Sequence, residues 1–343
     1  MKIENIEISL QNKPFIIAEM SGNHNKSIDR ALEIIKVAAQ TGAQAIKLQT
    51  YTADTMTIDH KGGLFDIKDP TSLWQNRNLY DLYKEAYTPW EWHEQLFRCA
   101  ADNGILCFST PFDHTAVDFL EYLQTPAYKI ASFENIDHPL LKKVAKTGKP
   151  VIMSSGACSL FDLAESVQVL RDAGCKDVVL LKCTSNYPAN PENSNVKTIP
   201  HMRELFNCEI GLSDHTMGIG VPIAAVTLGA TVIEKHFTLC RAEGGVDSAF
   251  SLEPAEMKAL VVETERAWQS LGNVQYGIQE TEIKSLNFKR SVYVVKDIEP
   301  GEVFTNQNLK VIRPGDGLHP KFYDKILGKI ALEKYKRGSP FLY

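Results

Sequence analysis

The stretch EIGLSDHTMGIGVPIAAVTLGATVIEKHF (209–237) decides the fold, because it holds one full repeat of the pattern that dominates the chain. It begins with a short apolar run that ends in polar residues, continues through a segment with helical spacing, and reaches Gly229 before a second apolar run begins. This alternation predicts a strand, a helix and a second strand, with the glycine ending the helix. Strands that are joined through a helix lie parallel in one sheet.

The same kind of strand run occurs eight times. The runs are FIIAE (15–19), AIKLQT (45–50), ILCFST (105–110), AYKIAS (127–132), PVIMSS (150–155), VVLLKCTS (178–185), EIGLSDH (209–215) and VIEKHF (232–237). Nearly continuous apolar strands that alternate with helices indicate a parallel sheet covered on both faces. Eight such units in about 270 residues fit an α/β fold of the (β/α)8 TIM-barrel type better than an open sheet.

The pattern changes after Gly272. Residues 273–288 are polar and carry no strand signal, whereas 289–343 contain short β-type runs and turn residues. We therefore expect a barrel domain at 1–272, a linker at 273–288 and a small β-rich domain at 289–343. A domain of about 55 residues buries only a marginal core, so the small domain is expected to dock on another surface.

Composition and charge exclude several classes of protein. Of the 343 residues, 44% are hydrophobic and 23% are charged, so a sizeable core is expected rather than a disordered chain. With 37 basic against 42 acidic residues and no basic run, the chain lacks the electrostatics of a nucleic-acid binder. The longest apolar stretch, 221–233, is too short to cross a membrane, and the N-terminus has no apolar signal segment.

The cysteines indicate a reducing compartment. The seven cysteines include no CxxC pair, so neither a disulfide framework nor a structural zinc site is predicted. Reduced thiols are typical of the cytoplasm. Cys107 and Cys183 fall inside strand runs and are expected to be small core residues.

All eight predicted strands end in polar residues. The residues are Glu19, Lys47, Gln49, Ser109, Thr110, Lys129, Ser132, Ser154, Ser155, Lys182, Thr184, Ser213, Asp214, His215, Glu234, Lys235 and His236. Alternate side chains on barrel strands point inward, where an unpaired charge costs several kcal/mol. Because the chemistry of a TIM barrel belongs at the carboxyl ends of its strands, this pattern predicts an active site there.

Two histidines close neighbouring strands. Ser213 and His215 share one strand parity, as do Glu234 and His236, so each pair should project to one side. Two imidazoles with carboxylates nearby suit Mn²⁺, Fe²⁺, Co²⁺ or Zn²⁺ with coordination positions left open. The alternative is that each histidine is only hydrogen-bonded within the fold.

Lys47 and Lys129 lie at strand ends with hydroxyl side chains around them. Two cations with serines and threonines favour a phosphate or carboxylate site. The alternative is the Schiff-base lysine of an aldolase, which needs a single desolvated amine. Glu19 fits a general acid or base, a metal ligand or a hydrogen-bond partner of Lys47.

Loops at the same end of the strands carry weaker signals. Residues 21–26 (SGNHNK) follow the first strand and either shape a turn or contact a substrate. Residues 51–80 form a long polar stretch, which is typical of a lid or a binding loop. Thr88 and Glu91 have the spacing of a capping box, with Pro89 at the first helical position, so a helix is expected to begin there.

Nine motifs in their order along the chain resemble the sialic acid synthase family. They are AEMSGNHN (18–25), KLQTYTADTM (47–56), STPFD (109–113), YKIAS (128–132), SSG (154–156), KCTSNYP (182–188), GLSDHTMGIG (211–220), EKHFTL (234–239) and KVIRPGDGL (310–318). The resemblance implies condensation of phosphoenolpyruvate with an N-acetylated amino sugar to a nonulosonic acid. The tail resembles the antifreeze-like (SAF) domain that is fused to these synthases.

Within that family, the first two motifs are most similar to the pseudaminic acid synthase branch, whose acceptor is 2,4-diacetamido-2,4,6-trideoxy-L-altrose. The sialic and legionaminic branches typically carry AE-G-NHNG at the first loop, and Met20, Ser21 and Lys26 depart from that pattern. N-acetylneuraminate or legionaminate synthase is therefore the alternative. A lysine-imine aldolase and a non-catalytic carbohydrate-binding protein built on the tail are more distant alternatives.

The resemblance also implies roles for single residues. Its catalytic positions match Glu19, Lys47, Lys129 and Glu234, and its metal ligands match His215 and His236. Its phosphoenolpyruvate contacts match Lys47, Thr110, Lys129, Ser132, Ser154 and Ser213, and a phosphate-side asparagine aligns with Ser185 or Asn186. Its sugar contacts match Gln49, Tyr187, Asp247 and Arg313. The implied cofactor is a divalent metal, Mn²⁺ first, with Mg²⁺ or Co²⁺ as alternatives. The implied assembly is a domain-swapped homodimer in which Arg313 lies over a partner's barrel.

Overall fold

The computed structural model describes residues 1–70 and 72–342. Thr71, inside the predicted loop 51–80, and Tyr343, at the end of the predicted small domain, lie outside the described residues. The chain divides into two compact units, Met1–Gly272 and Asn273–Tyr343, and each is described by itself. No helix among the described residues is long and apolar enough to span a membrane.

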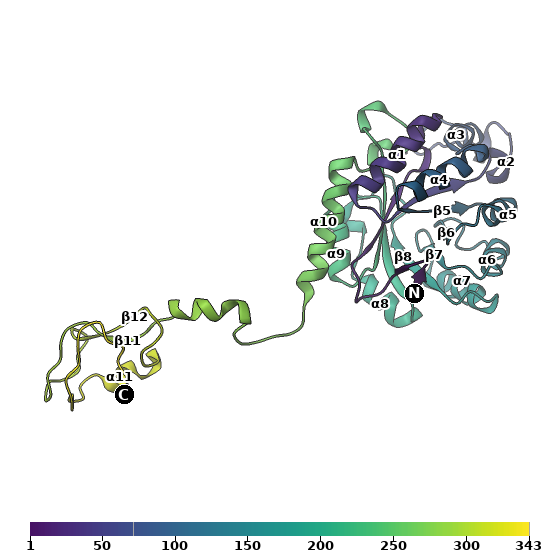
Figure 1. Cartoon of the computed structure of the whole chain (residues 1–343). Coiled ribbons are helices and arrows are strands. Elements are labelled where there is room, and N and C mark those ends of the chain that lie inside the picture. The colour runs from purple at the N-terminus through teal and green to yellow at the C-terminus, as the bar shows by residue number, and fades with distance from the viewer. Residues whose placement is uncertain (71, 343) are drawn as a thin grey trace. The chain divides into compact units, whose positions relative to one another are not determined.

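Eight parallel strands of the first unit form a closed barrel, with helices outside it (Figure 1). The strands, each paired with the next and the last with the first, are β3 (Phe15–Glu19), β4 (Ala45–Thr50), β5 (Leu106–Pro111), β6 (Tyr128–Ile130), β7 (Val151–Ser154), β8 (Val178–Cys183), β9 (Glu209–Asp214) and β10 (Val232–His236). The predicted (β/α)8 barrel is therefore confirmed. The strands β6 and β8 end earlier than predicted, so 131–132 and 184–185 belong to the following loops.

At least one helix follows each barrel strand. The helices are α1 (Ile28–Thr41), α2 (Ala53–Met56), α3 (Leu79–Ala86), α4 (His93–Asp102), α5 (His114–Tyr122), α6 (His138–Ala145), α7 (Leu160–Asp172), α8 (Thr198–Phe206), α9 (Gly220–Thr227) and α10 (Pro254–Leu271). The first is delimited as its sequence suggests: the Ser27 side chain accepts a hydrogen bond from the Arg30 amide, and Gly42 ends the helix at φ 92°.

Two local predictions are wrong. The stretch 51–80 is not one open loop, because α2, a 3₁₀ turn at Gly63–Phe65 and the start of α3 interrupt it. Thr88 does not cap a helix, since its hydroxyl lies 3.2 Å from Nε2 of His24 and a 3₁₀ turn at Trp90–Trp92 leads into α4 instead. At 51–80 local caps form the helices, such as the reciprocal hydrogen bonds of Thr52 and Thr55 at α2, whereas at Thr88 a contact distant in sequence outweighs the local signal.

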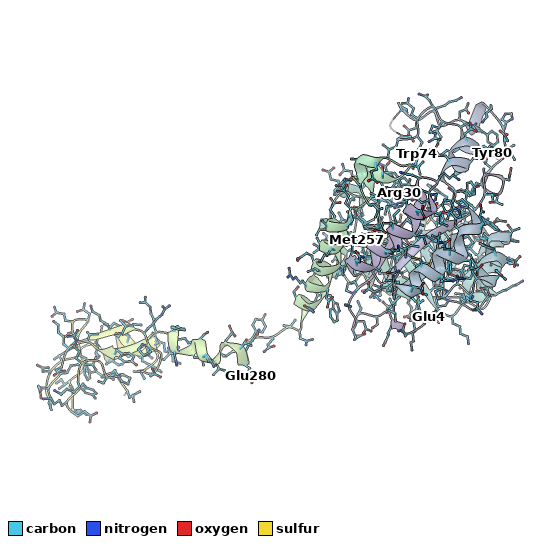
Figure 2. All side chains as sticks on the ribbon, turned by 45° about the horizontal axis from the view of Figure 1, so that its top comes forward. Glu4, Arg30, Trp74, Tyr80, Met257 and Glu280 are labelled. Carbon is cyan, nitrogen blue, oxygen red and sulfur yellow. The ribbon has the colours of Figure 1, made fainter. Side chains whose placement is uncertain are left out.

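The barrel interior is closed at the amino end of its strands. An N-terminal hairpin, β1 (Lys2–Ile3) with β2 (Ile6–Glu7), contributes Ile3 and Ile8 to an apolar cluster with Phe15 and Ile17. Figure 2 labels Glu4 of this hairpin at one end of the barrel and Trp74 at the other. With the hairpin end filled by apolar side chains, polar groups are left to the opposite end.

The second unit has its own core. Strands β11 (Ser291–Val294) and β12 (Leu309–Ile312) pair antiparallel, after a 3₁₀ helix at Glu280–Phe288, and a short helix α11 (Tyr323–Ile326) follows. The buried cluster consists of Val292, Val294, Ile298, Phe304, Leu309, Ile326, Ala331 and Phe341. The predicted small β-rich domain is therefore confirmed.

Candidate active site

Each barrel strand has an inward series that changes from apolar to polar toward its carboxyl end. On β3 the series runs from Phe15 through Ile17 to Glu19, and the first two belong to the apolar cluster inside the barrel. The polar ends of the eight inward series are Glu19, Lys47 with Gln49, Thr110, Lys129, Ser154, Cys183, Ser213, and Glu234 with His236. They form one layer at the barrel mouth.

Strand β8 differs from the sequence prediction. Leu181 belongs to the inner cluster and Leu180 to the outer core, so Cys183 points inward and Lys182 outward. Cys183 is buried, as predicted, but it lies at the polar end of the barrel interior, outside both apolar clusters. Burial alone would raise the pKa of its thiol, but the neighbouring His215 outweighs burial and lowers that pKa to about 7.

Lys47 lies at the centre of the polar layer. Its Nζ is 2.6 Å from Oε2 of Glu19, 3.8 Å from Oε1 of Glu234, and donates to the Thr110 hydroxyl at 3.2 Å. Gln49 donates to the other oxygen of Glu19 at 3.0 Å. Strands β3, β4, β5 and β10 thus bring one cation between two carboxylates.

Lys129 supplies a second buried cation. Its Nζ donates to the Ser154 hydroxyl at 2.6 Å and to the Ile130 carbonyl at 2.8 Å. On the other side of the mouth, the Ser213 hydroxyl donates to Oε1 of Glu234 at 3.2 Å. Oε2 of Glu234 is buried without a hydrogen-bond partner among the residues that the structure describes.

A hydroxyl cradle lies beside these groups, where Gly156 faces Ser132 and Ser185. A Cβ on Gly156 would lie 2.1 Å from the Ser185 hydroxyl and 2.6 Å from the Ser132 hydroxyl, so only glycine lets these side chains approach. Asn186 is exposed, and its side chain accepts from the Tyr187 amide at 3.1 Å. Of the two alternatives for the phosphate-side position, Ser185 is therefore the one at the mouth.

Burial and charge separate the two carboxylates chemically. Burial raises the pKa of Glu19 to about 7, and Lys47 offsets this only in part. Burial would also raise the pKa of Glu234, but Lys129 and Lys47 outweigh it and hold that pKa below its usual value. Burial lowers the pKa of Lys129. One carboxylate is thus kept ionised, whereas the other is suited to exchange a proton near neutral pH.

The two histidines meet at the same rim. The rings of His215 and His236 have centroids 5.4 Å apart. Nδ1 of His215 donates to the Thr184 carbonyl at 3.0 Å, which leaves Nε2 of the neutral ring with a lone pair, and Nδ1 of His236 is buried with no partner in the described chain. Such a backbone bond to one ring nitrogen commonly orients a metal-binding histidine.

These donors fit a divalent cation. Within 1–70 and 72–342, no cluster of three or more His, Cys, Asp or Glu side chains is arranged to hold a metal. Two imidazoles alone would leave several coordination positions open, as in catalytic rather than structural sites. The residues therefore suit an ion that is shared with water and substrate.

Aromatic side chains border the histidine pair. The Tyr187 ring lies 4.4 Å from His215 and 5.3 Å from Phe250, and Trp74, from the long segment after β4, lies 5.8 Å from Tyr187. The Trp74 indole donates to the Val246 carbonyl at 3.0 Å. These rings form an aromatic wall on one side of the histidine pair.

The comparisons with known proteins agree with this geometry. Residues 34–276 match the NeuB family, which is more than half of the chain, and residues 289–343 match the SAF domain. The chain belongs to the NeuB family.

Relatives cover almost the whole of this NeuB-family chain. A pseudaminic acid synthase of Campylobacter jejuni is 46% identical over 95% of this chain and 95% of its own length. The pseudaminic acid synthase of Helicobacter pylori is 42% identical over 95% of this chain and 96% of its own. The crystal structure of an N-acetylneuraminic acid synthetase from Leptospira borgpetersenii, in complex with citrate, matches with a TM-score of 0.74 at 32% identity, covering 83% of this chain and 94% of that one.

In this NeuB-family barrel the loop 21–26 is mainly structural. The side-chain amide of Asn23 donates to the Phe237 carbonyl at 2.9 Å and to the Ser251 hydroxyl at 2.8 Å. Burial lowers the pKa of His24 to about 4, and its ring lies edge-on against Trp92. Ser21 is the exception, since its hydroxyl donates to Oδ2 of the predicted sugar contact Asp247.

Sequence reasoning missed Glu134. This side chain follows β6 in a loop, its Oε2 is buried without a partner in the described residues, and burial raises its pKa to about 7. Lys129 opposes that shift, so the two side chains interact. Loop residues have no strand parity, and no sequence signal marks Glu134 as inward.

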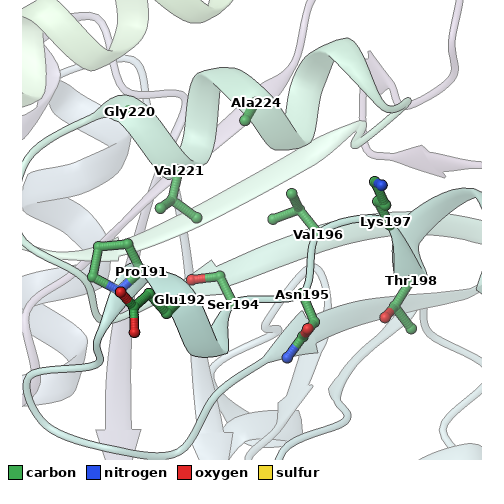
Figure 3. Close-up of a pocket in the computed structure, with 10 residues that line it drawn as sticks. All are labelled: Pro191, Glu192, Ser194, Asn195, Val196, Lys197, Thr198, Gly220, Val221 and Ala224. Carbon is green, nitrogen blue, oxygen red and sulfur yellow. The ribbon is translucent and has the colours of Figure 1, made fainter.

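Two further features involve other residues than those described above. Arg313 follows β12 in the second unit and is exposed there. A cavity of about 380 Å³ lies between the segment before α8 and the start of α9, and Figure 3 draws the residues that line it. Its lining consists of Pro191, Glu192, Ser194, Asn195, Val196, Lys197, Thr198, Gly220, Val221 and Ala224, none of which is a predicted site residue.

Proposed function

We propose that this chain is a pseudaminic acid synthase. It condenses phosphoenolpyruvate with open-chain 2,4-diacetamido-2,4,6-trideoxy-L-altrose and water, forming pseudaminic acid and releasing inorganic phosphate. The observation that carries this proposal is the pair of buried lysines, Lys47 and Lys129, in one barrel mouth with a proton-exchanging carboxylate and two imidazoles. The identities of 46% and 42% to pseudaminic acid synthases support the choice of acceptor.

The lysines hold the anionic substrate. Lys47 and Lys129, with hydroxyl donors around them, bind the carboxylate and phosphate of phosphoenolpyruvate, so that C3 faces the aldehyde carbon of the sugar. The donors are Thr110, Ser132, Ser154, Ser185 and Ser213. Holding both reactants turns a bimolecular step into an oriented one.

The histidines hold the cofactor. We assign His215 and His236 to a divalent cation, Mn²⁺ first, with Mg²⁺ or Co²⁺ as alternatives. Such an ion acts as a Lewis acid and polarises a carbonyl oxygen. Gln49, Tyr187 and Asp247 orient the sugar, and the ionised Glu234 offsets part of the positive charge of the two lysines.

Glu19 moves the proton. When C3 bonds to the aldehyde carbon, the π electrons of the carbonyl move to its oxygen, which becomes an alkoxide, and positive charge develops at C2, where water adds. The Glu19 carboxylate stabilises that charge and accepts the proton of the adding water, and a proton is in turn delivered to the alkoxide. The tetrahedral product then loses phosphate by cleavage of the bond between C2 and the bridging oxygen, and the proton of its C2 hydroxyl leaves with the phosphate, so that a C2 ketone remains.

We further propose that the enzyme is cytoplasmic and works as a domain-swapped homodimer. Arg313 of the SAF domain would contact the sugar in a partner's barrel, which gives the small domain a catalytic purpose. The domain boundaries we propose are 1–272, 273–288 and 289–343.

A phosphate-release assay tests the function. We expect phosphate from phosphoenolpyruvate with the 6-deoxy-altrose acceptor and Mn²⁺, much less with N-acetylmannosamine or the legionaminate precursor, and none after EDTA. Preference for either other sugar would assign a different branch. Inactivation by borohydride in the presence of pyruvate, without phosphate release, would indicate an aldolase instead.

A further inference from the structure

Ser21 has an unusual backbone for a buried residue. It begins the 3₁₀ turn Ser21–His24 directly after β3, and its φ is 47°. The non-glycine residues with positive φ in the described chain are Glu4, Ser21, Asn25, Lys26, Asn76, Gln124, Ala157, Asn195 and Asn207, and Ser21 is the buried one among them. Strained conformations of this kind persist where the surrounding structure requires them, and they cluster at functional sites.

The strained turn is pressed against the loop that carries Asp247. The Ser21 hydroxyl donates to Oδ2 of Asp247. At the next position, a Cβ on Gly22 would lie 2.2 Å from the Val246 side chain, so glycine is needed for this approach. The Ser251 hydroxyl donates to the Asp247 carbonyl at 2.7 Å, which fixes the backbone on the other side.

The carboxylate of Asp247 is itself buried in the site. Burial raises its pKa, and the Ser21 hydroxyl and the Gly22 amide oppose the rise, followed by His215 and Lys47. Burial raises the pKa of Tyr51 and of Tyr187, and the nearby Asp247 carboxylate adds to both shifts. Asp247 therefore shares its space with the metal-binding rim and the lysine centre. In that place a neutral donor such as Ser21 stabilises the ionised form without adding another charge.

We propose that Ser21 is a positioning residue, whose hydroxyl holds the Asp247 carboxylate in the orientation that binds the acceptor sugar. This inference rests on the proposed function, since it deepens the role assigned to Asp247. The strained backbone of the turn is what brings the hydroxyl to Oδ2 of Asp247. The side chain acts through Asp247 and does not touch the reacting atoms.

Two substitutions separate the hydroxyl from the backbone. Ser21→Gly removes the hydroxyl and relieves the positive φ, whereas Ser21→Ala removes the hydroxyl and keeps the strain. We expect both to raise the acceptor KM about tenfold, the effect of losing one hydrogen bond to a charged group, with the phosphoenolpyruvate KM unchanged. Ser21→Gly should melt at or above the wild-type temperature, so a folding defect is not the cause. Gln124→Gly, an exposed residue with φ 56°, is the matched control and should leave the kinetics unchanged.

A double-mutant cycle tests the coupling. If Ser21 acts through Asp247, Ser21→Gly should change the acceptor KM less than about twofold when Asp247→Asn is already present. Additive effects, or equal changes in both substrate KM values, would overturn the inference. Wild-type kinetics in an active Ser21→Gly enzyme would overturn it as well and leave the proposed function standing. A wild-type enzyme that releases no phosphate with any acceptor would instead contradict the function.

Discussion

Lys47 is the residue on which the charge balance of the barrel mouth depends. Its ammonium lies 2.6 Å from Glu19 and 3.8 Å from Glu234, and all three side chains are buried. Removing one partner of a buried ion pair leaves an uncompensated charge, which is costly even where the intact pair adds little stability.

Lys47→Met is therefore expected to lower the free energy of unfolding by about 3–5 kcal/mol, measured by urea unfolding. With the cation gone, Glu19 and Glu234 should bind protons more tightly when folded than when unfolded, so the loss should grow from about pH 5 to about pH 8. Lys182→Met is the control, because Lys182 points away from the barrel interior. Equal losses in the two variants would contradict the assigned charge balance.

Glu19 gives the reaction its pH dependence. Burial raises its pKa to about 7 in the free enzyme, and only the ionised form accepts a proton from water, so kcat/KM should fall as the pH drops below about 7. Glu19→Gln should remove this limb and reduce kcat/KM by about 10²–10⁴-fold. A pH profile of kcat/KM checks both expectations, and an acidic limb that persists in Glu19→Gln would assign it to another group.

For single residues, the sequence predicts which residue types lie together at the barrel mouth, but it predicts less well which atoms are in contact. The alternation of side chains along strands was enough to predict that Ser213 lies near Glu234 and that His215 lies near His236. The bond from Ser21 to Asp247 joins residues 226 positions apart in two loops, and loops have no period from which such a contact can be inferred.

At the scale of elements, the strands were predictable because their inward side must be apolar at one end and polar at the other. Strand β8 was the difficult case, since Lys182 and Cys183 are adjacent and both parities end in a polar group. Leu180 packs in the core outside the barrel and Leu181 packs inside it. Because side chains alternate along a strand, Cys183 and not Lys182 faces the site. The Thr88 signal failed because His24 offers its hydroxyl a buried partner.

The segment after β4 carries a testable contact. The Trp74 indole donates to the Val246 carbonyl and lies against Tyr187, beside the assigned sugar contact Asp247. Trp74→Ala should raise the acceptor KM about tenfold or more and leave the phosphoenolpyruvate KM within about twofold, since an aromatic contact of a half-buried side chain and a hydrogen bond are lost together. Leu73→Ala, at an exposed neighbour, is the control. Similar kinetics in the two variants would show that Trp74 does not shape the acceptor site.

At the scale of the whole molecule, the chain has two units with separate cores. The change of pattern after Gly272 made this division visible in the sequence, because periodic strand and helix runs stop there. The surface on which the small unit docks depends on how subunits assemble, and the spacing of hydrophobic residues along the chain does not predict that. The proposed domain swap therefore needs a test that reports on the partner.

Subunit mixing supplies that test. Arg313→Ala should raise the sugar KM without changing metal content, and His236→Ala should be inactive. If the SAF domain reaches the partner, a mixed dimer regains one intact site, because the Arg313→Ala barrel receives a normal tail. Activity at low sugar should then rise above that of both parents when the two variants are unfolded and refolded together. A mixture no more active than the sum of its parents would contradict the swap.

The central claim is that the barrel mouth joins phosphoenolpyruvate to a sugar with cleavage of the bond between carbon and oxygen. Phosphoenolpyruvate labelled with oxygen-18 at the bridging position tests it most directly, with mass spectrometry of both products after one turnover with the 6-deoxy-altrose acceptor. We expect the label to leave entirely in the inorganic phosphate. Label retained in the nonulosonic acid would contradict it.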